Sequence, residues 1–175
     1  MLDRSKFWST PTTVGTITRS PAMTVEVLPA IPQVMISGDF ANAMARFDFP
    51  APVGLLAQAE GERYSLRLAR SRILVVGLDL TAEPQSWFDG MAMSSMTGAL
   101  AVIEISGPAR MELVARGTAI DPESASPCAA LHFAGVNSIL YKYDDRLRLH
   151  FDRGLVSYMA EWIVANDIPG SKSAL

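Results

Sequence analysis

Few residues in this chain have side chains suited to catalysis or metal binding. The 175 residues include two histidines, His132 and His150, and a single cysteine, Cys128. Zinc needs three or four closely spaced ligands, and no Cys or His pair here has that spacing. Both histidines alternate with apolar neighbours in runs typical of strands, so we expect them at a sheet surface or partly buried. Cys128 follows Pro127, and we expect it to be a small buried apolar residue.

The carboxylates and glycines offer little more. Asp79 and Glu104 are the acidic residues that fall inside apolar, strand-like segments. No glycine-rich phosphate motif is present. The corner Ser106–Pro108 could present amide groups at a helix start to an anion, although a strand-to-helix turn is the simpler interpretation. Because no nucleophile–base pair and no opposed carboxylates are found, the sequence predicts no catalytic residue and no metal site.

Composition excludes two classes of protein. The net charge is −3, and the 15 Lys and Arg residues are scattered, which argues against nucleic-acid binding. Four arginines, Arg116, Arg146, Arg148 and Arg153, could form a mildly basic zone for an acidic partner, or simply be scattered surface charge. Neither a secretory signal nor a run of about 20 apolar residues is found, so we expect a cytoplasmic protein.

Hydrophobic periodicity predicts an α+β chain with an internal repeat. The segments Val34–Phe47 and Val102–Gly117 both read as a strand, an Ile-Ser-Gly corner and a short helix. The predicted strands are Gln33–Ser37, Tyr64–Arg70, Ile73–Leu80, Leu100–Ile105, Ala129–Ala134, Ser138–Tyr143 and Arg146–Asp152. The predicted helices are Asp39–Phe47, Glu83–Met93, Pro108–Arg116 and Leu155–Asn166. This order predicts two ferredoxin-like split βαβ halves, about residues 33–93 and 99–166.

Local signals refine these elements. Ser106 is expected to cap the helix from Pro108, and Gly117 to close it in a left-handed conformation. The final helix should turn an apolar stripe containing Trp162 toward the core. Met91, Met93 and Met96 suit either the core or an adaptable partner surface.

The ends of the chain lie outside the expected domain of residues 22–170. Residues 1–21 are rich in Thr, Ser and Pro and read as an extended arm, and residues 171–175 as a frayed tail. Phe7 and Trp8 interrupt the polar arm, and two adjacent aromatic side chains there should dock onto this domain or onto another chain. We expect contact with a partner chain.

An ordered series of motifs resembles the gamma subunit of heterotetrameric sarcosine oxidase, a relative of the aminomethyltransferase folate-binding domains. The matching residues are Ile105–Pro108, Ala115–Gly117, Ile120–Asp121, Pro127–Ala129 and, in the last helix, Trp162. The resemblance implies an aminomethyltransferase-like fold and a non-catalytic subunit that supports assembly. Arg70-Ser71-Arg72 departs from the turn usual in the family, which leaves open a complex for another N-methylated amine.

The resemblance also implies where the chemistry of such a complex occurs. Flavin, NAD and tetrahydrofolate would be bound by other chains, and the partners would be a large alpha subunit with beta and delta chains. The alternative is a small-molecule module that holds folate or a similar pterin, or a stand-alone aminomethyltransferase-like protein. A folate site of that kind would need a carboxylate between the two halves, and Glu104 is the better candidate, although an edge or interface position would explain it as well.

Overall fold

The computed structural model describes residues 14–80, 87–88, 90–121 and 126–167. The strands are β1 (Gly15–Arg19), β2 (Thr24–Val27), β3 (Gln33–Gly38), β4 (Gln58–Ala59), β5 (Tyr64–Ala69), β6 (Arg72–Val76), β7 (Trp87–Phe88), β8 (Met91–Ser95), β9 (Leu100–Ser106), β10 (Ala130–Phe133), β11 (Val136–Tyr143) and β12 (Arg146–Asp152). The helices are α1 (Phe40–Phe47), α2 (Arg110–Gly117) and α3 (Val156–Ala165), with a 3-10 turn, η2 (Arg153–Leu155), before α3.

Two antiparallel sheets make up the fold, which is α+β as the sequence predicts. One has the strand order β1-β2-β9-β12-β11-β10, with short β4 added parallel to β11, and the other has the order β5-β6-β3-β8-β7. Each sheet is built around the strand of one repeat unit, β9 in the first and β3 in the second. The chain therefore starts in the first sheet with β1 and β2, builds the second sheet, and returns.

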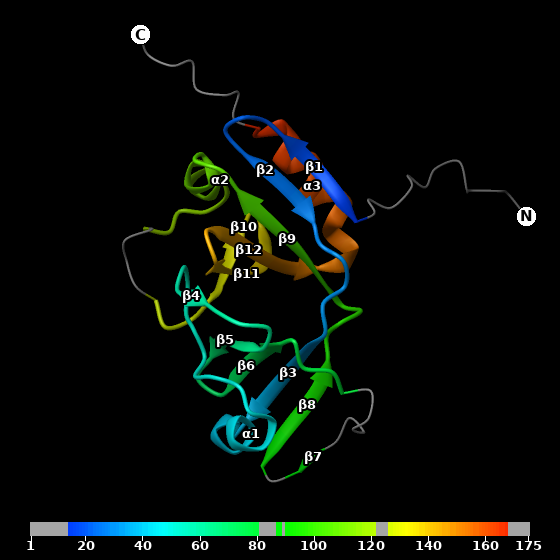
Figure 1. Cartoon of the computed structure of the whole chain (residues 1–175), viewed down its shortest axis with the longest axis vertical. Coiled ribbons are helices and arrows are strands. Elements are labelled where there is room, and N and C mark those ends of the chain that lie inside the picture. Colours follow the sequence, from blue (N-terminus) through cyan, green and yellow to red (C-terminus); the bar gives the residue numbers. More distant parts are fainter. Residues whose placement is uncertain (1–13, 81–86, 89, 122–125, 168–175) are drawn as a thin grey trace, which may run out of the picture.

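The two sheets are stacked face to face between helices (Figure 1). Alternating side chains of β9 and β12, such as Ile103, Ile105 and Leu149, pack with α2 and α3 in one core. A second core lies between the sheets, and a third lies between the second sheet and α1. Strand β6 is buried on both faces, because Ile73 and Val75 face α1 while Leu74 and Val76 face the other sheet. Its unbroken apolar run predicted this position.

One predicted helix is instead a pair of strands. The spacing of Trp87, Phe88 and Met91 suggested a helix over 83–93, but Trp87–Phe88 and Met91–Ser95 are paired strands. Met91 and Met93 alternate on the buried face of β8, and Met96 is half-buried, so these methionines are core residues. Part of the predicted helix, residues 83–86 and 89, lies outside the described residues.

Part of the predicted N-terminal arm of residues 1–21 is a strand. Gly15–Arg19 is an edge strand that pairs with β2. Phe7, Trp8 and the tail 171–175 lie outside the described residues. Within the described part of the chain, no helix has the length and apolar character needed to cross a membrane.

The ends of α2 also differ from expectation. Ser106 does not cap this helix: the N-cap residue is Ala109, without a side-chain cap, and its N–H donates to the Ala22 carbonyl. Gly117 is the last helical residue and has no positive φ. A Cβ there would meet the Phe133 ring at 2.4 Å, so a small residue is required for packing.

Candidate functional site at the junction of the two sheets

A chain of hydrogen-bonded polar side chains crosses the apolar core between the sheets. Tyr64 and Gln33 come from β5 and β3 of one sheet, while Tyr141 and His150 come from β11 and β12 of the other. All four are almost fully inaccessible to solvent. Polar side chains in a protein core are nearly always hydrogen-bonded.

Each polar atom in this series of side chains has a hydrogen-bond partner. The Tyr64 and Tyr141 hydroxyls lie 2.7 Å apart, the Tyr141 hydroxyl is 2.7 Å from His150 Nε2, and His150 Nδ1 is 2.7 Å from Gln33 Oε1. Burial, followed by the nearby Arg148 charge, lowers the pKa of His150 to about 3, so the imidazole is neutral. A neutral ring that donates from Nδ1 to the amide oxygen must accept at Nε2 from Tyr141.

That assignment fixes the direction of the remaining bonds. Tyr141 donates to His150 and therefore accepts from Tyr64, which in turn accepts from Arg148 Nη1 at 3.0 Å. Burial raises the pKa of both tyrosines, so both hydroxyls stay protonated at neutral pH. The bonds run in one direction, from the Arg148 cation through two tyrosines and a histidine to Gln33.

Glu104 lies at the charged end of this series of hydrogen bonds, next to Arg148. Its carboxylate accepts from Arg148 Nε at 3.0 Å and from Arg146 Nη1 at 2.5 Å. The Glu104 side chain is only 8% exposed, and the Arg148 guanidinium also lies 3.5 Å over the centre of the Tyr143 ring. Glu104 is therefore a buried, doubly paired carboxylate at the face between the sheets, and both of its oxygens already have cationic partners.

This arrangement holds two sheets together and leaves no group poised for proton transfer. General acid–base catalysis works best with a group whose pKa lies near the operating pH, and here the histidine is held neutral while both phenols are held protonated. Among the described residues, no three His, Cys, Asp or Glu side chains are grouped so as to hold a metal ion.

The structure places the histidines and the cysteine in different environments. His150 is fully buried, which corrects the expectation of a surface or half-buried position, whereas His132 is exposed on edge strand β10. The hydrogen-bond partner of His150 Nδ1, Gln33, is distant in sequence, so the local alternation of residues could not reveal this buried position. Cys128 is half-buried rather than buried, and its thiol donates to the Leu68 carbonyl at 2.8 Å.

The remaining predicted residues are not brought together in one site. Asp79 is exposed. Of the four arginines, Arg146 and Arg148 share Glu104, while Arg116 binds Glu112 and Arg153 binds backbone carbonyls elsewhere. The Ser106–Pro108 corner is covered by the chain before β2, because the Ala22 carbonyl accepts from Ala109 N at 3.1 Å.

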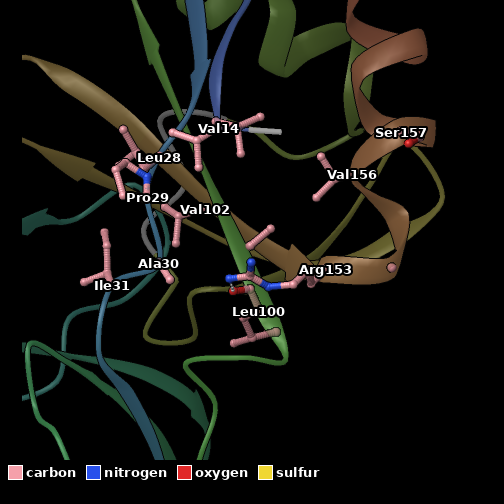
Figure 2. A pocket seen from close by; sticks show the side chains of 13 residues that line it. Val14, Leu28, Pro29, Ala30, Ile31, Leu100, Val102, Arg153, Val156 and Ser157 are labelled. Atoms are coloured by element: carbon pink, nitrogen blue, oxygen red, sulfur yellow. Dashed lines mark hydrogen bonds between the residues drawn. The ribbon is translucent and has the colours of Figure 1, made fainter. Parts of the chain in front are cut away.

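A separate apolar groove opens at the surface beside the junction (Figure 2). It has a volume of about 610 Å³ and lies between the linker after β2, the start of β9 and the start of α3. Val14, Leu28, Val102 and Val156 contribute apolar surface, and Arg153 is the one charged residue among the described residues that line it. Its chemistry suits an apolar or aromatic group rather than a highly charged ligand.

Comparison with solved structures identifies a related fold. No protein-family model and no curated protein sequence matches the chain. A chain of the heterotetrameric sarcosine oxidase from Corynebacterium sp. U-96, solved in complex with pyrrole 2-carboxylate, superposes with a TM-score of 0.65. The alignment covers 86% of each chain at 15% sequence identity. The two chains therefore share a fold along most of their length.

Proposed function

We propose that this chain is the non-catalytic, gamma-type subunit of a sarcosine-oxidase-type complex. The complex would carry out oxidative demethylation of sarcosine or a related N-methylamine, linked to tetrahydrofolate. Flavin, NAD and the folate would be held by the alpha, beta and delta chains, and this chain would support assembly against the large alpha subunit.

One observation carries the proposal: the alignment with the sarcosine oxidase chain covers equal shares, 86%, of both chains. Equal shares mean that the two chains have nearly the same length, so the matched chain is itself a small one. A shared fold across one domain of a large catalytic chain would have given a much smaller share of that chain. The ordered motifs from Ile105 to Trp162 support the same subunit.

The junction supports a structural role over folate binding. The alternative function would use Glu104 to grip a pterin ring, but both oxygens of this carboxylate accept from arginines. Removing a partner from a buried ion pair is costly, so a ligand would have to displace Arg146 or Arg148 at a large penalty. The residues at the centre of the fold are thus engaged with one another.

Expression with and without companion chains tests the proposal. The chain would be produced alone and together with the large, flavin-binding and small chains of a sarcosine-type oxidase from the same genome. We expect the chain alone to be colourless and inactive on sarcosine, and to co-purify in stoichiometric amount with the others in an active complex. Omitting it should lower the yield of assembled complex.

Two results would contradict this function. One is a yellow preparation of the chain alone with a flavin absorption band. The other is an oxidase that assembles in unchanged yield without it.

A further inference from the structure

A second, smaller cavity opens at one end of the space between the two stacked sheets. It has a volume of about 280 Å³ and is lined by residues of both sheets. Met35 lines it from the inner face of β3, because its neighbours Val34 and Ile36 pack toward α1. Ile139 and His150, which are paired across β11 and β12, line it from the other sheet. The cavity is therefore an unfilled part of the core between the sheets.

Small side chains at its rim keep this part of the core open. In the closed part of the same core, Leu74 is inaccessible to solvent. At the cavity, the large apolar side chains of Leu68 and Leu100 remain half-buried, and the exposed rim residues Ala69 and Ala130 have only methyl groups. Protein cores have few voids larger than a water molecule, so an open space of this size between two sheets is a candidate binding site.

Two polar side chains from opposite sheets line the same cavity. Arg72 is the first residue of β6 and Asn137 the second residue of β11, and both are exposed. Arg72 Nε donates to Ser37 Oγ at 3.3 Å, while its two terminal nitrogens have no partner among the described residues. His150 offers only ring carbons, because both of its nitrogens are already hydrogen-bonded. The polar groups available to a ligand are therefore a guanidinium and an amide.

We propose that this cavity binds a small organic monocarboxylate with an aromatic or alicyclic body. The carboxylate accepts from the terminal nitrogens of Arg72, which present parallel N–H groups in the geometry that a carboxylate accepts. The Asn137 amide is a second donor, and the ring lies against Leu68 and Ile139. Because an apolar cavity of about 150 Å³ is enough for benzene, the observed volume accommodates one ring with its carboxylate.

Size and charge narrow the class of ligand. The volume lies below the range of about 300–1,000 Å³ that is typical of sites for drug-sized ligands, so a whole folate molecule exceeds it. An ammonium ligand would meet the Arg72 charge, and no carboxylate is found among the described residues that line the cavity. An inorganic anion would leave the apolar walls in contact with water. The assignment does not depend on the proposed function, because it concerns the chain in isolation.

Methyl NMR of the full chain alone tests the assignment, with benzoate as the probe. The methyl groups of Met35, Leu68, Leu100 and Ile139 would be labelled and assigned. We expect benzoate to shift these resonances with a Kd of about 1 mM, which is usual for a ligand of this small size. Benzamide, which has the same ring and no charge, should bind about tenfold more weakly.

Three substitutions separate the charge of the site from its shape. Arg72→Gln should weaken benzoate binding about tenfold and leave benzamide binding unchanged. Arg70→Gln is the matched control, because it removes a neighbouring exposed arginine that does not line the cavity, and it should leave both affinities unchanged. Ala130→Leu fills the rim and should abolish binding of both probes. The dispersed methyl spectrum of each variant shows that it is folded.

Three results would overturn the proposal. Unshifted resonances of the four methyl-bearing residues up to about 50 mM benzoate would show that the cavity takes no such ligand. Equal affinities for benzoate and benzamide, or unchanged benzoate binding by Arg72→Gln, would show that the guanidinium does not recognise the ligand. Small shifts that are spread over the surface and do not saturate would show that benzoate binds only non-specifically.

Discussion

The two copies of the strand–corner–helix unit use the same backbone device, although their sequences diverge after Ile-Ser-Gly. Gly38 and Gly107 both have positive φ, +116° and +103°. A Cβ at Gly38 would lie 2.2 Å from the Gly90 carbonyl oxygen, and one at Gly107 would lie 2.5 Å from that of Ala22. In each half the same carbonyl also accepts a backbone N–H near the helix start, from Asp39 or from Ala109.

The strand beside each corner comes from a different part of the chain. In the half built on β3, the strand that begins at the corner is β8, which follows it in sequence. In the half built on β9, the equivalent strand is β2, which precedes the whole first half. The two halves therefore share the strand–corner–helix unit and a strand beside its corner. In each half this neighbouring strand comes from a different position along the chain.

The corner glycines give the largest expected effects. Gly38→Ala and Gly107→Ala should each lower the free energy of unfolding by about 3 kcal/mol, because a left-handed conformation and a backbone clash are combined. Gly61→Ala is the matched control: its φ is +77° with open space around the Cβ position, so it should cost about 1 kcal/mol. Equal losses at all three positions in urea denaturation would show that the close approach contributes nothing.

His150 lies in the second half and bonds to Gln33 of the first, and the pH dependence of unfolding tests how much this residue contributes to stability. His150 has its pKa lowered to about 3 in the folded state, against 6.5 when unfolded. Between these values the unfolded chain binds more protons, so stability present above pH 6.5 is lost as the pH falls. His150 should therefore account for a loss of about 2 kcal/mol between pH 7 and pH 5.

Comparing variants isolates this contribution from that of the carboxylates. The unfolding free energy of His150→Gln should fall less steeply with acid than that of the parent, while His132→Gln should follow the parent. Parallel curves for the parent and His150→Gln would mean that the imidazole is already protonated or solvated in the folded protein.

Tyr64 is the contribution of the first half to the middle of this chain of bonds. Tyr64→Phe removes an acceptor for Arg148 and a donor for Tyr141 and should cost about 1–2 kcal/mol. Tyr143→Phe removes only an exposed bond to the Gly61 carbonyl and should cost about 0.5 kcal/mol or less. Thermal unfolding of both variants measures the difference, and a reversed order would place the important tyrosine at the rim of the junction.

The smallest expected effect on stability concerns the N-terminal ends of α1 and α2, the two helices of the repeat. The Asp39 side chain caps α1 by accepting from Ala41 N at 3.1 Å, whereas α2 has no side-chain cap. Asp39→Ala should lower stability by about 0.5–1 kcal/mol. Ala109→Ser should change it little, because Ala109 (φ −86°, ψ 4°) lacks the extended backbone of a capping residue and Glu112 N already donates to the Ala109 carbonyl. Denaturant midpoints that move equally would show that the two helix starts are equivalent.

The sequence predicted the parts of this fold that depend on local patterns. The strands β3, β5, β6, β9, β10, β11 and β12, and helices α1, α2 and α3, were predicted correctly because their apolar periods and corner residues are local. Strand β2 was missed because Pro29 and Pro32 follow it closely, and β8 was mistaken for helix because Trp87, Phe88 and Met91 also fit a helical spacing. Each forms a strand because it pairs with a central strand, β2 with β9 and β8 with β3, and begins next to the corner glycine at the end of that strand.

The polar junction was the least predictable part of the site. Glu104 was singled out as an acidic residue in an apolar strand, but its arginine partners lie on another strand and their pairing depends on register. The bond between His150 and Gln33 joins residues 117 positions apart. A buried glutamine at the start of β3 was the available signal, since an uncharged amide in an apolar strand needs a distant partner.

The subunit composition of the assembled oxidase decides whether this chain is one of its subunits. Native mass spectrometry would be applied to the complex obtained by co-expressing this chain with the large, flavin-binding and small chains. We expect one species that contains all four chains, and collisional dissociation of this species should release a subunit of 18.9 kDa. A complex of the other three chains at full occupancy, with this chain recovered only as a free monomer, would contradict its assignment as a subunit.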